Sequence, residues 1–191
     1  MTRPSTVLAR LAPFAVLVWV AGCTPGEGLP PMPDYTASRY QLGSGDTVRI
    51  ITFGEDQMTG EFRVDEQGEI AVPLLGEVKC AGLTTQQLQQ RITAELKQRK
   101  VLTDPSVSIQ VLAYRPVFVL GEVARPGQYP YQPGMTMLTA VAVAGGFTYR
   151  AVEGYADDIR TSDTRHASEG RIMPRSLIAP GDVVKVFQRR F

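Results

Sequence analysis

The sequence predicts an α+β fold made of two small domains in tandem. Short runs of alternating apolar and polar residues, typical of strands, follow one another from residue 40 and are separated by glycine- and proline-containing turns. Two stretches, 84–100 and 136–144, instead have the spacing of an amphipathic helix. With 191 residues, of which 43% are apolar, the chain can bury one moderate core or two small ones. We place a domain boundary at residues 114–116 and therefore expect two small cores.

The N-terminus predicts a lipoprotein signal peptide over residues 1–22. Arg3 and Arg10 precede an apolar run that is shorter than the ~20 residues needed to span a bilayer. The run ends in VAGC, which resembles the lipobox of bacterial lipoproteins; the alternative is an ordinary secretory signal that happens to meet a cysteine. We expect a covalent lipid on Cys23 as the one attached group, with no cofactor and no metal, and residues 23–39 as a lipidated flexible tether.

The charge and the remaining cysteine argue against several functions. Removal of Arg3 and Arg10 leaves 18 basic residues of the 20, against 19 acidic ones, and this near balance argues against a nucleic-acid binder. Once Cys23 carries lipid, Cys80 has no partner for a disulfide. The single histidine, His166, lies far along the chain. We therefore expect Cys80 to be a small buried apolar residue and not a metal ligand or nucleophile.

The first domain is predicted over residues 40–113. A glycine–aspartate turn in LGSGD leads into the β-rich run TVRIITF. EFRV and EIAV are expected to form a hairpin that reverses at Gln67 and Gly68, and a short strand is expected at 76–79. Thr84 and Gln87 then resemble a capping box, before a helix whose apolar stripe repeats every four residues at Leu88, Ile92 and Leu96. The helix should stop near residue 100, ahead of a strand in SVSIQVL.

The second domain is predicted over residues 114–191. VFVLGEV and QYPY are expected to pair as strands around the ARPG reversal, and a helix from 136 to 144 should bury Leu138, Val141 and Ala142. Further strands are expected near 158–161 and 171–174. The last strand, in APGDVVKVF, follows the same kind of glycine–aspartate turn as LGSGDTVRI, which indicates shared turn chemistry and not a repeat.

Six segments in this order resemble bacterial polysaccharide export proteins. They are LGSGD, FRVDEQGEIAVPLLGEV, AGLTTQQLQQRI, DPSVSIQV, VFVLGEVARPGQYPYQPGMTMLTAVAVAGG and PGDVVKV. The resemblance spans 40–191 and implies a polysaccharide export domain, with a mixed sheet and one helix, over 40–113. It implies a β-grasp domain of the soluble-ligand-binding (SLBB) type over 114–191. Because nothing here corresponds to a further β-grasp repeat or to a C-terminal amphipathic helix, we expect a short form with a single β-grasp domain.

The resemblance implies a lipid-anchored subunit at the outer membrane, facing the periplasm. Copies of it would form a homo-oligomeric ring through which capsular polysaccharide or exopolysaccharide passes by passive transport. The implied partners are other copies of the chain, an inner-membrane polysaccharide co-polymerase, the polysaccharide and outer-membrane lipid; whether a separate outer-membrane β-barrel completes the route stays open. The alternative is a periplasmic saccharide-binding lipoprotein that does not itself form a conduit.

Catalysis is not expected from this sequence. The residues that are candidates for contact with polymer or with other subunits lie in the second domain. Neighbouring acidic residues at 55–56, 65–66 and 157–158 are interpreted as solvated turn residues, because adjacent side chains on an extended chain point to opposite faces. No nucleophile elbow, phosphate loop or zinc spacing is present. Candidate polymer or subunit contacts are Arg115, Arg125, Tyr129, Tyr131 and Arg150; for the tyrosines, packing of the hairpin against its helix is the preferred alternative.

Overall fold

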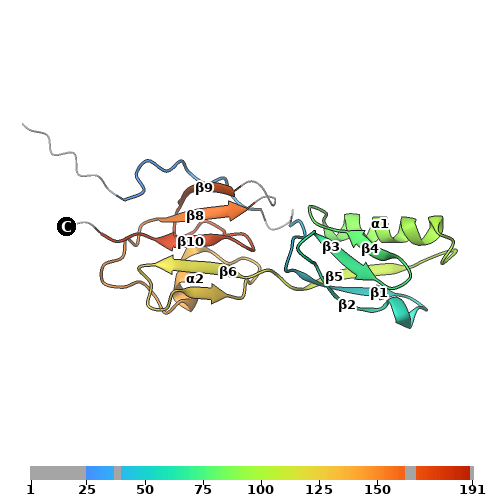
Figure 1. Ribbon diagram of the computed structural model, residues 1–191. Coiled ribbons are helices and arrows are strands. Elements are labelled where there is room, and N and C mark those ends of the chain that lie inside the picture. The colour runs from blue at the N-terminus through green and yellow to red at the C-terminus, as the bar shows by residue number, and fades with distance from the viewer. Residues whose placement is uncertain (1–24, 37–39, 162–166, 190–191) are drawn as a thin grey trace, which may run out of the picture.

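The computed structural model describes residues 25–36, 40–161 and 167–189, and it divides the chain into two units with separate cores (Figure 1). The first core runs from Leu42 to Val107 and the second from Val117 to Val186. Strands and helices are interspersed along each unit, so the α+β prediction is confirmed. Cys23 and His166 lie outside the described residues.

The first unit combines a three-stranded sheet, a two-stranded sheet and one α-helix. The three-stranded sheet has the order β2-β1-β5, with β1 antiparallel to both neighbours; its strands are β1 (Thr47–Thr52), β2 (Gly60–Arg63) and β5 (Val107–Ala113). A short 3₁₀ helix, η2 (Asp56–Met58), joins β1 to β2. The second sheet pairs β3 (Glu69–Val72) with β4 (Gly76–Lys79) in antiparallel orientation.

Helix α1 (Thr85–Gln98) begins and packs as its sequence predicts. The Thr84 side chain accepts a hydrogen bond from the Gln87 backbone, and the Gln87 side chain accepts one from the Thr84 backbone. This reciprocal capping satisfies backbone N–H groups that the first turn leaves without partners. The predicted apolar stripe is fully buried at Leu88, Ile92 and Leu96.

The expected hairpin between EFRV and EIAV is wrong, because the two strands belong to different sheets. The turn itself forms: the Asp65 and Glu69 backbones are joined by a 2.9 Å hydrogen bond, and the Glu69 N–H also donates to Asp65 Oδ1 at 2.7 Å. However, β2 pairs with β1, whereas β3 pairs with β4 across the next turn. The local turn was predictable, but the choice of pairing partner depends on strands elsewhere in the fold.

The second unit is a five-stranded mixed sheet with one helix. The strand order is β7-β6-β10-β8-β9, and β6 and β10 are parallel while the other neighbours are antiparallel. The strands are β6 (Val117–Gly121), β7 (Gly127–Tyr129), β8 (Ala156–Thr161), β9 (Ala167–Ile172) and β10 (Val183–Val186). The predicted hairpin around ARPG is therefore confirmed as β6 and β7. A helix beside a mixed sheet agrees with the expected β-grasp arrangement.

Helix α2 (Met137–Val143) forms with a capped N-terminus, but of the three residues predicted to face inward only Val141 is buried. Thr136 and Thr139 form its capping box. Leu138 is 48% exposed, and the buried residues are Met137, Ala140 and Val141. Leu138 and Ala142 were predicted to point inward and are exposed. The error is one of helical phase: Met137 occupies the core position that the prediction gave to Leu138.

Part of the expected tether lies on the second unit instead of standing free of it. We call residues 25–36 the N-terminal strap. The Met32 N–H donates to the Arg171 carbonyl at 2.9 Å, and the Arg171 N–H donates to the Pro30 carbonyl at 2.7 Å. The segment is proline-rich and extended, as predicted, but its backbone pairs with the edge strand β9 and leaves fewer open groups on that edge.

No helix among the described residues is both long enough and apolar enough to cross a membrane.

Candidate functional site

The junction between the two units is built on two glycine–aspartate turns of the same design. In the first, the Gly43 N–H donates to Asp46 Oδ2 at 2.8 Å, and the Asp46 N–H returns a bond to the Gly43 carbonyl at 3.1 Å. In the second, the Ala179 N–H donates to Asp182 Oδ2 at 2.6 Å, and the Asp182 N–H donates to the Ala179 carbonyl at 3.1 Å. Each aspartate is fully buried and closes its turn immediately before a strand.

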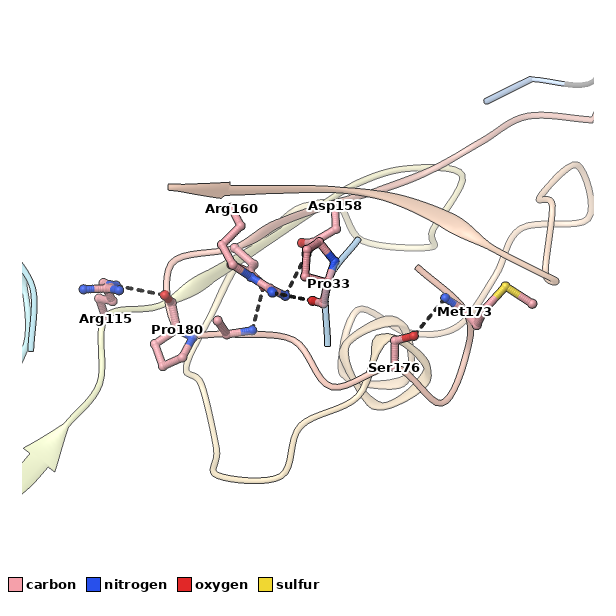
Figure 2. A network of polar contacts seen from close by, with 9 residues as sticks. Pro33, Arg115, Asp158, Arg160, Met173, Ser176 and Pro180 are labelled. Atoms are coloured by element: carbon pink, nitrogen blue, oxygen red, sulfur yellow. Dashed lines mark hydrogen bonds and ion pairs between the residues drawn. The ribbon is translucent and has the colours of Figure 1, made fainter. Parts of the chain in front are cut away.

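Arg115 connects the two turns. Its backbone N–H donates to Asp46 Oδ1 at 2.8 Å, and its side-chain Nε donates to the Pro180 carbonyl, also at 2.8 Å. In Figure 2, Arg115 reaches the Pro180 carbonyl from the side of the first unit. A single residue thus bonds to the first turn through its backbone and to the second turn through its guanidinium.

Aromatic rings fill the junction around these bonds. The rings of Tyr40 and Tyr114 meet edge to face with centroids 5.0 Å apart, and Tyr114 meets Tyr131 in the same way at 5.4 Å. The Tyr40 hydroxyl donates to Asp46. Burial, followed by the hydrogen bond to Asp46, raises the pKa of Tyr40 above its ordinary value, so it remains a neutral donor. Edge-to-face pairs add ~1 kcal/mol each beyond their buried area, which makes this junction a packed contact.

A charged cluster lies in the second unit next to the junction. We define it as Asp158, Arg160 and Asp182. Nη2 of Arg160 lies 3.0 Å from Asp158 Oδ2 and 2.9 Å from Asp182 Oδ2, and Nε also contacts both Asp182 oxygens. The arginine side chain is 19% exposed and the two aspartates almost not at all. Both carboxylates are therefore held by one guanidinium in a water-poor setting.

Two acidic side chains share one positively charged guanidinium in this cluster, and the pKa of Asp158 is raised. Burial raises the pKa of Asp158 to about 8, with the nearby charge of Asp182 as the next cause and Arg160 opposing both. At neutral pH Asp158 is therefore mostly protonated. Asp157, on the opposite face of β8, has a pKa raised to about 6 by burial and by Glu169. The interpretation of 157–158 as solvated turn residues is wrong, since both are buried in a central strand.

The charged cluster also holds the N-terminal strap. Nη1 of Arg160 donates to the Pro33 carbonyl at 3.1 Å, and its guanidinium carbon lies 5.6 Å from the centre of the Tyr35 ring. Figure 2 shows Arg160 pointing toward both Asp158 and Pro33. The Arg160 guanidinium thus contacts two buried acids and the backbone of the strap at the same time. The cluster is therefore suited to holding the strap in place.

The candidate contact residues of the second unit do not gather at one place. Arg115 lies in the junction, as described, and Tyr131 is 7% exposed within the second core. Because little of its surface is exposed, burial favours the packing alternative for Tyr131. Tyr129 is half-buried, and its hydroxyl donates to the Arg125 carbonyl. For this tyrosine too, the structure favours the packing alternative.

The other two candidates, Arg125 and Arg150, are exposed at the opposite end of the second unit from the junction. The Arg125 N–H donates to the Ala144 carbonyl at the end of α2, and the Arg150 carbonyl accepts from the Arg189 N–H. Sequence reasoning missed Arg160 and Asp182. The glycine–aspartate turn in APGDV did indicate that Asp182 closes a turn, but nothing local indicated the pairing with Arg160, 22 residues away.

Cys80 is placed as predicted. It is fully buried, and its thiol lies 3.4 Å from the Gly68 carbonyl, to which it donates. Burial, assisted by Asp65, raises the pKa of the thiol to about 12, so the reactive thiolate is scarcely populated at neutral pH. Cys80 is therefore a core residue.

Two protein-family models match this chain, one over each folded unit. The family model "Polysaccharide biosynthesis/export protein" matches residues 34–112, and the SLBB domain model matches residues 116–158. Together the two models support a polysaccharide export protein with an SLBB domain. The first unit thus corresponds to the export model and the second unit to the SLBB model.

Curated relatives match over parts of their length. The exopolysaccharide production protein ExoF of Rhizobium meliloti is 34% identical over 121 residues, covering 58% of this chain and 29% of the relative. The EPS I polysaccharide export outer membrane protein EpsA of Ralstonia nicotianae is 31% identical over 169 residues, or 81% of this chain and 42% of EpsA. The polysialic acid transport protein KpsD of Escherichia coli is 31% identical over 109 residues, or 56% and 19%. The chain therefore spans less than half the length of these curated relatives.

Proposed function

We propose that this chain acts in polysaccharide export at the outer membrane, as a lipid-anchored periplasmic subunit of a homo-oligomeric ring. The observation that carries the proposal is the tandem order of an export domain and an SLBB domain, each coinciding with a folded unit. Relatives named for exopolysaccharide production, polysaccharide export and polysialic acid transport support the role in export. The ring would conduct capsular polysaccharide or exopolysaccharide passively, supplied by an inner-membrane co-polymerase.

The geometry supports a structural role in such a ring over a catalytic one. Arg160 contacts both buried acids of the charged cluster, and Asp46 and Asp182 each accept backbone N–H bonds that close their turns. A rigid two-unit subunit can present one surface to its neighbours and another to a polymer. Weak contacts along such a path let a hydrophilic chain slide, whereas tight binding would stop it.

Native mass spectrometry of the lipidated, detergent-extracted protein tests the ring. A single closed oligomer is expected, because closed symmetric assemblies satisfy every subunit interface. A strictly monomeric species at every concentration would contradict the conduit. A monomer that binds the producer's own polysaccharide would instead support the alternative of a saccharide-binding lipoprotein.

Deletion of the chain in its native host tests the role in export. Cell-surface or secreted polymer should be lost, and polymer should accumulate in the periplasm; complementation with the wild-type chain should restore release. Undiminished release from the deletion strain would contradict a role in export.

The lipid anchor is tested separately by Cys23→Ala. We expect the variant to move from the membrane fraction to the soluble periplasmic fraction, because two or more acyl chains are needed for stable anchoring and the variant carries none. Cys80→Ala is the matched control and should stay in the membrane fraction, since Cys80 is buried in the core. A Cys23→Ala protein that remained in the membrane fraction would contradict lipidation at this site.

A further inference from the structure

The outward side of helix α2 is apolar although it is exposed in a single chain. None of the seven residues of α2 is charged, and the hydroxyl of its one polar residue, Thr139, is used in the N-terminal cap. Leu138 is 48% exposed and Val143 is 45% exposed. Met173 is 55% exposed beside them, since the Leu138 N–H donates to the carbonyl of the next residue, Pro174, at 3.0 Å. A helix that is apolar on every side is normally covered. We call Leu138, Val143 and Met173 the helix patch.

The outer face of the five-stranded sheet is a second exposed apolar surface, on the opposite side of the same unit. Val119 lies in the core that α2 covers, so its neighbours Phe118 and Leu120 point to the other face of the sheet. Phe118 is 38% exposed and Leu120 is 42% exposed. The register places Phe118 beside Val183, and Val183 beside Ile159, in one row across β6, β10 and β8. We call Phe118, Leu120, Val183 and Ile159 the sheet patch.

The two patches suit a second copy of this chain in head-to-tail contact. Because they lie on opposite sides of one unit, a copy that places its sheet patch on the helix patch of its neighbour keeps its own helix patch open for the next copy. Contacts of this heterologous kind repeat from copy to copy, and they close into a ring when the rotation between copies allows it. A two-fold contact would instead cover only one patch of each copy and leave the other exposed.

The sheet patch has an acidic residue at its edge. The row that carries Phe118 continues to Glu169 on β9, which is exposed. The next row of the same face holds two basic residues, Lys185 and Arg171, and both are in register with Asp157, which lies between them on β8. The basic side chains on this face therefore have an acidic neighbour in their own chain, and Glu169 gives the edge of the sheet patch its negative charge.

The exposed charges beside the helix patch are positive. The Arg125 N–H bonds to the Ala144 carbonyl at the C-terminal end of α2, and Arg175 follows Pro174 at the N-terminal end; both arginines are exposed. Two helix patches in contact would bring these arginines together. A helix patch on a sheet patch would instead bring an arginine toward Glu169, so the charges favour contact between the two different surfaces.

We propose that the helix patch of one copy packs on the sheet patch of the next, so that this pair of surfaces joins neighbouring subunits of the ring. The inference rests on the ring proposed above and adds which two surfaces of the chain meet in it. It follows from two apolar surfaces on opposite faces of one unit and from the unlike charges beside them.

Cysteine cross-linking tests this contact. The full-length lipidated protein carries Phe118→Cys together with Leu138→Cys and is treated with a short bismaleimide in detergent micelles. Cys80 is buried and escapes the reagent. Because position 118 of one copy should face position 138 of the next, the double variant should give a ladder of covalent multimers beyond the dimer, whereas each single variant should stay monomeric. Dimers from either single variant would indicate a two-fold contact and overturn the proposal.

Two further variants test specificity and charge. Phe53→Cys with Leu138→Cys is the matched control, because Phe53 is 85% exposed but lies in the first unit; it should give no ladder, and a ladder equal to that of the test pair would overturn the proposal. Glu169→Arg in the Phe118→Cys, Leu138→Cys protein should lower the fraction of multimers, since arginines then meet arginines. An unchanged fraction would overturn the pairing of the two patches.

Native mass spectrometry shows whether the interface or the ring itself fails. A closed wild-type oligomer without a ladder from the double-cysteine protein refutes only the proposed contact, whereas a wild-type monomer refutes the ring. Leu138→Glu, at an exposed position of α2, should dissociate the oligomer while the circular dichroism spectrum stays that of the wild type. An intact oligomer in Leu138→Glu would overturn the proposal.

Discussion

At the scale of single residues, buried aspartates organise both halves of the molecule. Asp46 and Asp182 close matching turns, as the shared glycine–aspartate pattern predicts, and each then bonds to a residue far along the chain. Asp158 differs because it shares Arg160 with Asp182 and has no positive partner of its own within the charged cluster. The excess acid makes it the residue whose protonation should influence stability.

We predict that the free energy of unfolding falls as pH rises from about 4 to about 8. The pKa of Asp158 is raised from 3.8 to about 8 in the folded chain, so the folded state binds more protons than the unfolded state in this window. Stability is therefore greatest below the unfolded pKa and is lost as pH rises through the folded one. Urea denaturation over a pH series measures this slope.

Asp158→Asn should reduce that slope and leave only the smaller part that the raised pKa of Asp157 contributes, since the amide keeps a neutral side chain of the same size at every pH. Asp56→Asn, at an exposed position in η2, is the matched control and should retain the wild-type slope. An Asp158→Asn protein with the full wild-type slope would show that another group titrates.

At the scale of elements, helix caps and turns could be predicted from the sequence, but which strands pair with one another could not. The capping box at Thr84 and the stripe of α1 depend on residues within four positions of one another, and both are confirmed. The turn after Asp65 also forms as expected. The wrong pairing of EFRV with EIAV, and the phase of α2 at Leu138, depend on distant strands and on the shape of the core. A sequence pattern carries no information on either.

The turn between β2 and β3 should depend on Gly68 more than the turn after β1 depends on Gly54. Gly68 has φ +79° and would place a Cβ 2.4 Å from the Ala81 Cβ, whereas Gly54 has the same φ with open space around it. Gly68→Ala should therefore lose about 1 kcal/mol from the left-handed backbone and a further ~1–3 kcal/mol from overpacking. Gly54→Ala should lose only the first amount. Urea denaturation of the two variants measures the difference, and equal losses would contradict the crowded turn.

At the scale of the whole molecule, contacts between residues far apart in sequence join the units and the strap. Arg115 and Asp46 are 69 residues apart, and Tyr155 and Pro25 are 130 apart. The sequence placed Arg115 at the boundary but could not indicate that it spans the junction, and it predicted a tether where the structure has the strap. Arg125 and Arg150 remain exposed, so they alone of the predicted contact arginines stay candidates for polymer or neighbours.

Because Arg115 reaches both turns, its side chain should hold the two units at a fixed distance. Arg115→Ala removes the bond to Pro180 and the guanidinium near the Tyr40 ring but keeps the backbone bond to Asp46. We expect each unit to stay folded while their separation becomes variable. Electron–electron resonance between spin labels at positions 53 and 149, on the soluble Cys23→Ala background, should give a broader distance distribution. Arg125→Ala, which removes an arginine at the end of the second unit opposite the junction, is the control and should leave the distance distribution as narrow as in the parent protein. Equal widths in the parent protein, Arg115→Ala and Arg125→Ala would show that the tyrosine packing alone holds the junction.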